Sequence, residues 1–368
     1  MSFDAERLAQ PSLRTLRAYD PGHDLPALRK RFAAVLAELG SNENPLGPSP
    51  QAMEAAQRAI GEMHRYPDPR AGMLREALAE KFAVSAACLA FGNGSHELLM
   101  LLAQCFAGPH ATVMRSQYGF AVFALATAAS GAKPLCVPAL SADDRQAPLG
   151  HDLEAMADAL HDGVRLVYLA NPNNPTGTWF SHDSLRAFLR RVPLDTLVVV
   201  DEAYGEYMQA PDLASAWTMH AEFPNLVVTR TFSKAYALAG LRAGYLLAHP
   251  SVTSVLERLR ESFNLNHVAM TAATAALSDT QHLDISMSRN AVARDALAGE
   301  LARRGYRTLP SQTNFLLMTL ETLADPIEHH LIERGVVVRP MGGYGLPGTL
   351  RISIGTADEN QRLLEALA

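Results

Sequence analysis

Thr231-Phe-Ser-Lys-Ala-Tyr-Ala-Leu-Ala-Gly-Leu-Arg-Ala-Gly-Tyr245 is the stretch around which the rest of this chain is organised. A hydrophobic run at 226–228 precedes it and is typical of a buried strand. Lys234 follows that run, and Arg242 and Gly244 follow the lysine. A single lysine beyond a strand end is usually a surface charge. Polar groups at the ends of two other predicted strands favour a different role for Lys234, because the residues at all three strand ends suit one ligand.

The composition is that of a globular protein. The chain has 368 residues, of which 48% are hydrophobic and 19% charged, which is enough for two domains or for one large domain with a smaller satellite. The formal net charge of −6 gives no electrostatic reason to expect nucleic acid or an anionic membrane as a partner.

The cysteines, the histidines and the N-terminus narrow the class of protein further. Cys88, Cys105 and Cys136 lie in apolar neighbourhoods without metal-like spacing, so we expect buried thiols rather than disulfides, zinc ligands or a nucleophile. The histidines are scattered, and we expect no metal site. The N-terminus lacks the apolar core of a signal peptide, and no apolar run approaches the ~20 residues that span a bilayer. A soluble cytoplasmic protein is predicted.

The middle of the chain alternates between apolar runs and helical patterns. Continuous apolar runs indicate strands buried on both faces, so we expect an α/β fold with three layers, α/β/α, around a mostly parallel sheet. The predicted strands are Thr112–Arg115, Leu135–Pro138, Val164–Ala170, Thr196–Val200, Leu226–Thr229 and Ala243–Ala248. The intervening helices are predicted at Phe120–Ser130, Leu153–Leu160 and Ser184–Val192.

The pattern changes after Pro250. A long helical region, 251–305, is followed by shorter predicted strands at Asn314–Met318, Val336–Arg339 and Leu350–Ile354. We therefore predict an N-terminal arm (1–45) that packs on the small domain and on a partner, a large domain (46–250) and a small α+β domain (251–368).

Three predicted strands end in polar residues. The ends are Asn171–Gly177, Asp201–Tyr204 and Thr231–Lys234. In parallel sheets, ligands bind outside the carboxyl ends of the strands. If the three strands are neighbours, an amide, a carboxylate, a phenol and an amine share one crevice. An aromatic nitrogen heterocycle with an aldehyde, a phenolic oxygen and a phosphate uses all of them, which describes pyridoxal 5′-phosphate.

This chemistry gives each residue a role. Lys234 would form an imine with the aldehyde. Asp201 would keep the pyridine nitrogen protonated, since a carboxylate stabilises a neighbouring cation. Asn174 and Tyr204 would hydrogen-bond the phenolic oxygen, and Tyr118 would cover the other face of the ring. Each residue alone has an ordinary explanation as a cap, a turn or a surface charge, and their joint occurrence carries the prediction.

A glycine-rich turn supplies a candidate phosphate site. Gly92-Asn-Gly-Ser95 opens a helical run, and the first turn of a helix offers free N–H groups and the positive end of the helix dipole. Gly94, Ser95, Ser233 and Arg242 are the expected phosphate contacts, with Arg242 contributing a planar fork of donors.

The sequence resembles the fold-type I pyridoxal-phosphate aminotransferases, and within them the histidinol-phosphate aminotransferase group, over nearly its whole length. The motifs that carry the resemblance are Ser41-Asn-Glu-Asn-Pro-Leu-Gly47, Tyr66-Pro-Asp-Pro69, Gly92-Asn-Gly-Ser95, Asn171-Pro-Asn-Asn-Pro-Thr-Gly177, Asp201-Glu-Ala-Tyr204, Thr231-Phe-Ser-Lys234, Gly240-Leu-Arg242 and Arg351-Ile-Ser-Ile-Gly355. They are highly specific for fold and cofactor, and moderately specific for the substrate.

The resemblance implies further roles. Lys234 matches the lysine that also moves a proton during catalysis. Arg351 matches the arginine that clamps the substrate carboxylate, a contact that Asn174 shares. Arg339 and Tyr19 match residues associated with a substrate phosphate. Tyr66 matches a tyrosine that reaches the cofactor phosphate of a neighbouring subunit, which implies a homodimer with shared active sites.

With these added, the predicted catalytic residues are Lys234, Asp201 and Tyr204. The predicted cofactor contacts are Gly94, Ser95, His96, Tyr118, Asn174, Asp201, Tyr204, Thr231, Ser233, Lys234, Arg242 and Tyr66. The predicted substrate contacts are Tyr19, Asn174, Arg339 and Arg351.

Two positions depart from the family pattern. His96 stands where the family commonly has aspartate after Gly-Ser. His267 stands where the family often has serine after the Asn-Val-Asn of a later loop.

The expected reaction transfers an amino group from L-histidinol phosphate to 2-oxoglutarate, a step of histidine biosynthesis. Aromatic amino-acid aminotransferase and phosphothreonine-type decarboxylase are the alternatives on the same fold. A regulator that binds the cofactor is disfavoured, because nothing before residue 40 resembles a basic helix-turn-helix.

Overall fold

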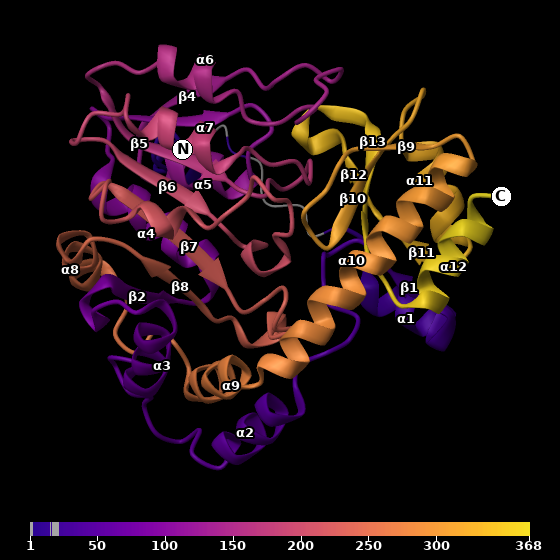
Figure 1. Cartoon of the computed structure of the whole chain (residues 1–368), viewed down its shortest axis with the longest axis horizontal. Coiled ribbons are helices and arrows are strands. Elements are labelled where there is room, and N and C mark those ends of the chain that lie inside the picture. The colour runs from indigo at the N-terminus through magenta and orange to yellow at the C-terminus, as the bar shows by residue number, and fades with distance from the viewer. Residues whose placement is uncertain (1–2, 15, 17–21) are drawn as a thin grey trace.

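A seven-stranded sheet forms the centre of the larger part of the molecule (Figure 1). The structure is a computed structural model that describes residues 3–14, 16 and 22–368, without the side chain of Ala34. In spatial order the strands are β2 (Leu89–Gly92), β8 (Gly244–Leu247), β7 (Leu226–Thr231), β6 (Leu197–Asp201), β5 (Val164–Ala170), β3 (Thr112–Ser116) and β4 (Lys133–Val137). Only β8 runs antiparallel to its neighbours, so the sheet is mostly parallel, as predicted.

Helices cover both faces of this sheet, which gives the predicted three layers. One hydrophobic core joins the sheet to α4 (Gly94–Phe106), α5 (Ala121–Ala129) and α8 (Pro250–Leu259). The core on the other face includes side chains from α2 (Pro50–Ile60), α3 (Gly72–Phe82), α6 (Leu153–Asp158), α7 (His182–Leu189) and α9 (His267–Ser278).

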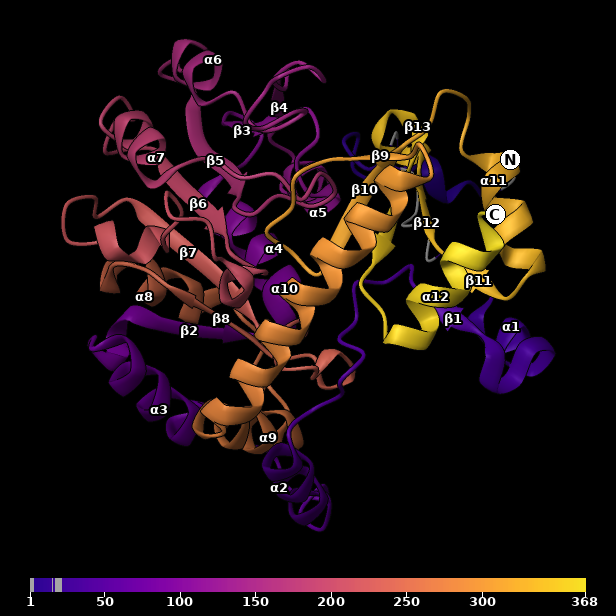
Figure 2. The ribbon, with the colours of Figure 1, turned by 45° about the vertical axis from the view of Figure 1, so that its right-hand side comes forward.

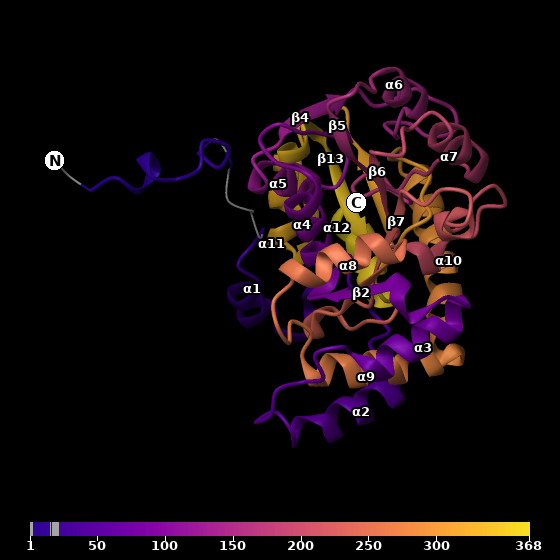
Figure 3. The same cartoon turned by 90° about the vertical axis from the view of Figure 1, so that its left-hand side faces the viewer.

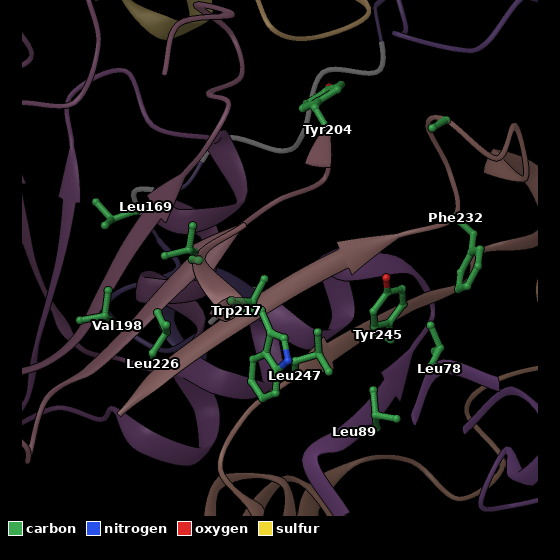
Figure 4. Packing of buried hydrophobic residues seen from close by; sticks show 14 of the residues in the cluster. Leu78, Leu89, Leu169, Val198, Tyr204, Trp217, Leu226, Phe232, Tyr245 and Leu247 are labelled. Atoms are coloured by element: carbon green, nitrogen blue, oxygen red, sulfur yellow. The ribbon is translucent and has the colours of Figure 1, made fainter. Parts of the chain in front are cut away.

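The second core draws side chains from each of four adjacent strands. Leu169, Val198, Leu226 and Leu247 lie on the same face of β5 to β8 (Figure 4). All four are at most 2% exposed. Truncating a buried leucine to alanine typically costs about 2–5 kcal/mol, so this face holds the strand ends in fixed positions.

The smaller part is built on a four-stranded antiparallel sheet. Its order is β12 (Arg339–Met341), β13 (Leu346–Ser353), β10 (Phe315–Thr319) and β9 (Arg307–Thr308). The helices α11 (Asp325–Glu333) and α12 (Ala357–Ala366) pack on it. The N-terminal segment joins this part, because β1 (Ala37–Glu38), which follows α1 (Leu25–Phe32), pairs in parallel with β11 (Val336–Val337).

The long helix α10 (Thr280–Arg303) connects the two parts (Figure 2). Leu283 near its start belongs to the core of the large sheet, whereas Leu297 and Leu301 near its end belong to the core of the small sheet. The division at residue 250 stays a prediction, but the packing favours a boundary inside α10. The reason is that residues 265–283 bury their apolar face against the large sheet.

Three local expectations were wrong. The predicted strand Val336–Arg339 is two short strands, β11 and β12, which pair in different sheets and break at Val338. The short strand β2 was missed, because its last residues were interpreted as part of the glycine-rich turn. Cys136 is exposed rather than buried, because it lies on the edge strand β4.

Candidate functional site

The three polar strand ends lie side by side. β5, β6 and β7 are adjacent and parallel, with Ala170 opposite Asp201 and Asp201 opposite Thr229. The predicted neighbour relation of these strands is therefore confirmed. The sheet brings the loops after Ala170, Asp201 and Thr231 to one edge.

Asp201 is a buried carboxylate with few charged neighbours. The Thr229 hydroxyl donates to its Oδ1 at 2.8 Å. Burial raises the pKa of Asp201 to about 7, although the Thr229 hydrogen bond and the nearby Lys234 act in the opposite direction. Because burial disfavours the charged form of this carboxylate, a cationic partner would stabilise it, so the site suits a positively charged group.

Lys234 lies just past β7, and its amine contacts backbone oxygens rather than a carboxylate. Its Nζ donates to the carbonyl of Asn42 at 3.2 Å and to that of Ser41 at 3.3 Å. Burial, followed by the positive charge of Arg351, lowers the pKa of Lys234 to about 8. A substantial fraction of the amine is therefore neutral near physiological pH, as a nucleophile or a proton acceptor requires.

Tyr204 presents its hydroxyl toward the N-terminal segment. Asn42 donates from Nδ2 to the Tyr204 hydroxyl at 2.8 Å. Burial raises the pKa of Tyr204 to about 12, so the phenol stays protonated and can itself donate a hydrogen bond. The ring packs edge-on against Phe315 of β10, with 5.3 Å between centroids. Tyr204 therefore contacts both parts of the molecule.

Asn42 is a site residue to which the sequence assigned no role. Its carbonyl accepts from Lys234 and from Asn314, and its side chain binds Tyr204. The surrounding motif, Ser41 to Gly47, is the only sequence signal for it. The partners of Asn42 lie more than 150 residues away, so no local pattern could have found them.

A cluster of donors forms a cradle for an anion. Arg242 donates from Nη1 to the Ser233 hydroxyl at 3.1 Å, and Thr231 donates to the same oxygen at 3.0 Å. A Cβ on Gly94 would lie 2.5 Å from Arg242 Nη2, and a Cβ on Gly244 would lie 2.5 Å from the backbone nitrogen of Ser95. Only glycines at these two positions let the N-terminus of α4 approach the arginine.

Two arginines face each other across β12 and β13. Arg339 is the direct cross-strand partner of Arg351. Arg351 is anchored, because it donates from Nη1 to Asn174 Oδ1 at 2.8 Å and from Nη2 to the Gly40 carbonyl at 2.8 Å. Asn174 in turn lies in the loop after β5, so the small sheet and the large sheet meet at this contact.

The remaining predicted residues lie in different settings. Tyr66 is 83% exposed and stacks on Phe263, with 4.6 Å between ring centroids. Tyr118 is half-buried and packs against a small cluster that includes Leu317 of β10. His96 lies in the first turn of α4 with part of its side chain exposed, and the partial desolvation of its ring, followed by the charge of Arg242, lowers its pKa. Tyr19 lies outside the described residues.

The donor set fits a phosphorylated pyridine aldehyde. It offers an amine of lowered pKa, a buried carboxylate that favours a cationic partner, and a cradle of glycines and an arginine shaped for an anion. Among the described residues, no group of three or more His, Cys, Asp or Glu could hold a metal ion. No helix in the described ranges is long and apolar enough to cross a membrane.

Comparisons with known proteins agree with this chemistry. Residues 34–367 match the sequence model of the family Aminotransferase class I and II. The chain is 44% identical over 371 residues to histidinol-phosphate aminotransferase 2 of Pseudomonas fluorescens, covering 100% of this chain and 98% of that protein. It is also 44% identical to histidinol-phosphate aminotransferase 2 of Pseudomonas aeruginosa, covering 98% of this chain and 96% of that protein.

A solved structure is similar over the same range. The crystal structure of histidinol-phosphate aminotransferase from Sinorhizobium meliloti in complex with pyridoxal-5′-phosphate superimposes with a TM-score of 0.87 at 32% identity. The match covers 98% of this chain and 96% of that one.

Proposed function

Because the chain belongs to the class I and II aminotransferases, we propose that it transfers an amino group from L-histidinol phosphate to 2-oxoglutarate, with pyridoxal 5′-phosphate as cofactor. Relatives that are 40–44% identical over nearly the whole chain carry the name histidinol-phosphate aminotransferase. Full-length similarity at this level supports a shared substrate.

The pairing of Arg339 with Arg351 is the observation that carries the substrate proposal. Residues directly opposite in an antiparallel pair have Cβ atoms roughly 4.5–5.5 Å apart, so the two guanidinium groups place two positive charges on one small area, which favours substrates that carry anionic groups. Histidinol phosphate carries a phosphate, and the acceptor 2-oxoglutarate carries two carboxylates. We assign the phosphate to Arg339 and the carboxylate clamp to Arg351, which Asn174 holds in place. Tyr19 is proposed to share the phosphate.

The cofactor, when bound, supplies an electron sink that lets the substrate lose a proton from its amino-bearing carbon. Lys234 would hold the cofactor covalently and, when displaced, accept and return that proton, which suits an amine with a pKa of about 8. Asp201 would hold a proton on the ring nitrogen. Tyr204 and Asn174 would hydrogen-bond the ring oxygen, with Asn42 orienting the Tyr204 hydroxyl.

Gly94, Ser95, Thr231, Ser233 and Arg242 are proposed to hold the cofactor phosphate. The closeness of Arg242 to Ser233 and to Gly94 supports this assignment. His96 lies in the same first turn of α4 as Gly94 and Ser95 and is proposed to contact the cofactor, and Tyr118 is proposed to cover the ring.

We further propose a homodimer in which Tyr66 reaches the partner's site. Exposed apolar side chains gather on one segment of the chain: Met53, Ile60, Met63, Tyr66 and Met73. Apolar patches of this kind mark interaction surfaces. Residues 3–14 extend away from the body (Figure 3), as expected of an arm that packs on a partner.

Mixing two inactive variants tests the shared site. Lys234→Ala and Tyr66→Ala would each damage both sites of a homodimer. A mixed dimer contains one site with neither substitution, so mixing should restore part of the activity. No gain on mixing would contradict the shared site.

The choice of substrate is tested by comparing amino acceptors. With glutamate as donor, kcat/KM should be far higher for imidazole acetol phosphate than for phenylpyruvate. The opposite preference would identify an aromatic amino-acid aminotransferase. Release of CO2 from phosphothreonine without an oxo acid would identify a decarboxylase.

A further inference from the structure

Arg230 lies on the face of the sheet opposite the cofactor site. On the site face, Thr229 donates to Asp201, its cross-strand partner. Successive side chains of a strand point to opposite faces, so the next residues, Glu202 and Arg230, meet on the far side. Arg230 donates to Glu202 Oε2 from Nη2 at 2.6 Å and from Nε at 3.0 Å. Glu202 is only 1% exposed and Arg230 only 8% exposed.

The same guanidinium also holds the turn after Tyr204. Glu206 lies in the 3-10 turn η4 (Gly205–Tyr207), and its Oε1 accepts from Arg230 Nη1 at 3.1 Å. A Cβ on Gly205 would lie 2.7 Å from Arg230 Cζ. Only glycine at position 205 therefore allows the arginine to pack against this turn.

Glu202 is fixed independently of the arginine. Its carboxylate also accepts from the Ser215 hydroxyl at 2.8 Å and from the Ala216 backbone N–H at 2.6 Å. Its own backbone N–H donates to the Thr229 carbonyl at 2.9 Å. The far-side anchor is thus rigid, and it restrains the ends of β6 and β7 together.

We propose that Arg230 is a positioning residue that fixes the relative placement of Asp201, Tyr204 and Lys234. Glu202 follows Asp201 directly, and Glu206 lies two residues after Tyr204. Arg230 itself lies on β7, shortly before Lys234 in the chain. One planar fork of donors therefore connects the three segments whose side chains surround the cofactor. The proposal rests on the proposed function only in taking these three residues as cofactor contacts, and it is independent of the substrate.

Stability alone does not account for this arrangement. A buried ion pair or triad is often no more stabilising than apolar residues of the same volume. Catalytic groups, in contrast, lose activity steeply with small displacements, by about 100-fold for about 1 Å. A rigid guanidinium with fixed partners suits that requirement, and a lysine cannot reproduce the fork.

The first test is Arg230→Lys in the holoenzyme, which keeps the charge and loses the fork. The pH midpoint of the visible absorbance of the lysine-bound cofactor should shift by about half a pH unit or more. We expect kcat for transamination to fall by about tenfold or more while KM changes by less than about threefold. Glu206→Gln should shift both in the same direction by smaller amounts, because the Glu202 contact remains.

Arg165→Lys is the matched control. Arg165 lies at the start of β5 and pairs with Asp195, just before β6, at 2.6 Å, so it is at the end of the sheet away from the site and its replacement should change neither readout. An Arg230→Lys protein with a lower Tm but a wild-type midpoint and kcat would overturn the proposal. If Arg230→Lys does not fold, Glu206→Gln decides by the same criteria. Failure of the wild-type protein to develop the visible band would instead overturn the cofactor assignment, which separates the two outcomes.

Discussion

Replacing Asp201 with asparagine should change how the stability of the cofactor-free protein depends on pH. Asp201 is buried at the end of β6, and burial raises its pKa from the usual 3.8 to about 7. Asparagine has nearly the same shape and does not titrate, so it can still accept from the Thr229 hydroxyl. The substitution therefore isolates the cost of ionising this carboxylate inside the protein.

The direction of the change in the free energy of unfolding with pH follows from proton binding. Between about pH 4 and pH 7 the folded protein retains a proton on Asp201 that the unfolded chain has released, so the free energy of unfolding falls as the pH rises through this range. Each pH unit corresponds to about 1.4 kcal/mol, which gives a loss of about 3 kcal/mol between about pH 5 and the folded pKa of about 7. The Asp201→Asn variant lacks this loss.

Urea unfolding of both cofactor-free proteins, at fixed protomer concentration and at about pH 5 and pH 8, measures the effect. The stability of Asp201→Asn relative to wild type should rise by about 3 kcal/mol between the two conditions. Asp195→Asn, which removes an exposed carboxylate near the start of β6, is the control and should show no such change. Equal pH dependence of Asp201→Asn and wild type would refute the reasoning.

Three other substitutions test separate parts of the site. Lys234→Ala should abolish the visible absorbance of the enzyme with its cofactor, and a persistent band would refute the lysine assignment. Arg339→Ala should lower kcat/KM for imidazole acetol phosphate by on the order of 10- to 100-fold, as expected for a lost charge-assisted contact, with much less effect on phenylpyruvate; equal losses for the two acceptors would contradict a phosphate role. Gly244→Ala should weaken cofactor binding by about tenfold or more, since its Cβ would lie 2.4 Å from the Gly94 carbonyl carbon and displace the N-terminus of α4. Gly240→Ala is its control, because a Cβ there meets nothing within 4 Å, and equal Kd values for the two variants would refute the cradle.

The parts of the site that the sequence predicts share a physical origin. Continuous apolar runs indicated strands buried on both faces, and such strands lie in parallel sheets whose carboxyl ends meet at one edge. Asn174, Asp201 and Lys234 each lie within a few residues of the end of one of these runs, so their proximity could be predicted without knowing any tertiary contact. Gly94 and Arg242 were assigned to a phosphate from their residue types, but their close approach could not be predicted, because the sequence does not reveal that β8 places one against the other.

The contacts that the sequence could not predict depend on register across long separations. Arg339 faces Arg351 only because the predicted strand 336–339 breaks at Val338, so that its second part leaves β11 and pairs with β13. Nothing in the sequence distinguishes Arg230 from other residues of a buried strand. Its role depends on the adjacent strand β6, which places Glu202 within hydrogen-bond distance. The residues facing the cofactor site can therefore be predicted from their positions after the strands. The residues that restrain them can be identified only from the contacts in the folded sheet. The pH titration of Arg230→Lys accordingly tests what the fold adds to the sequence motif.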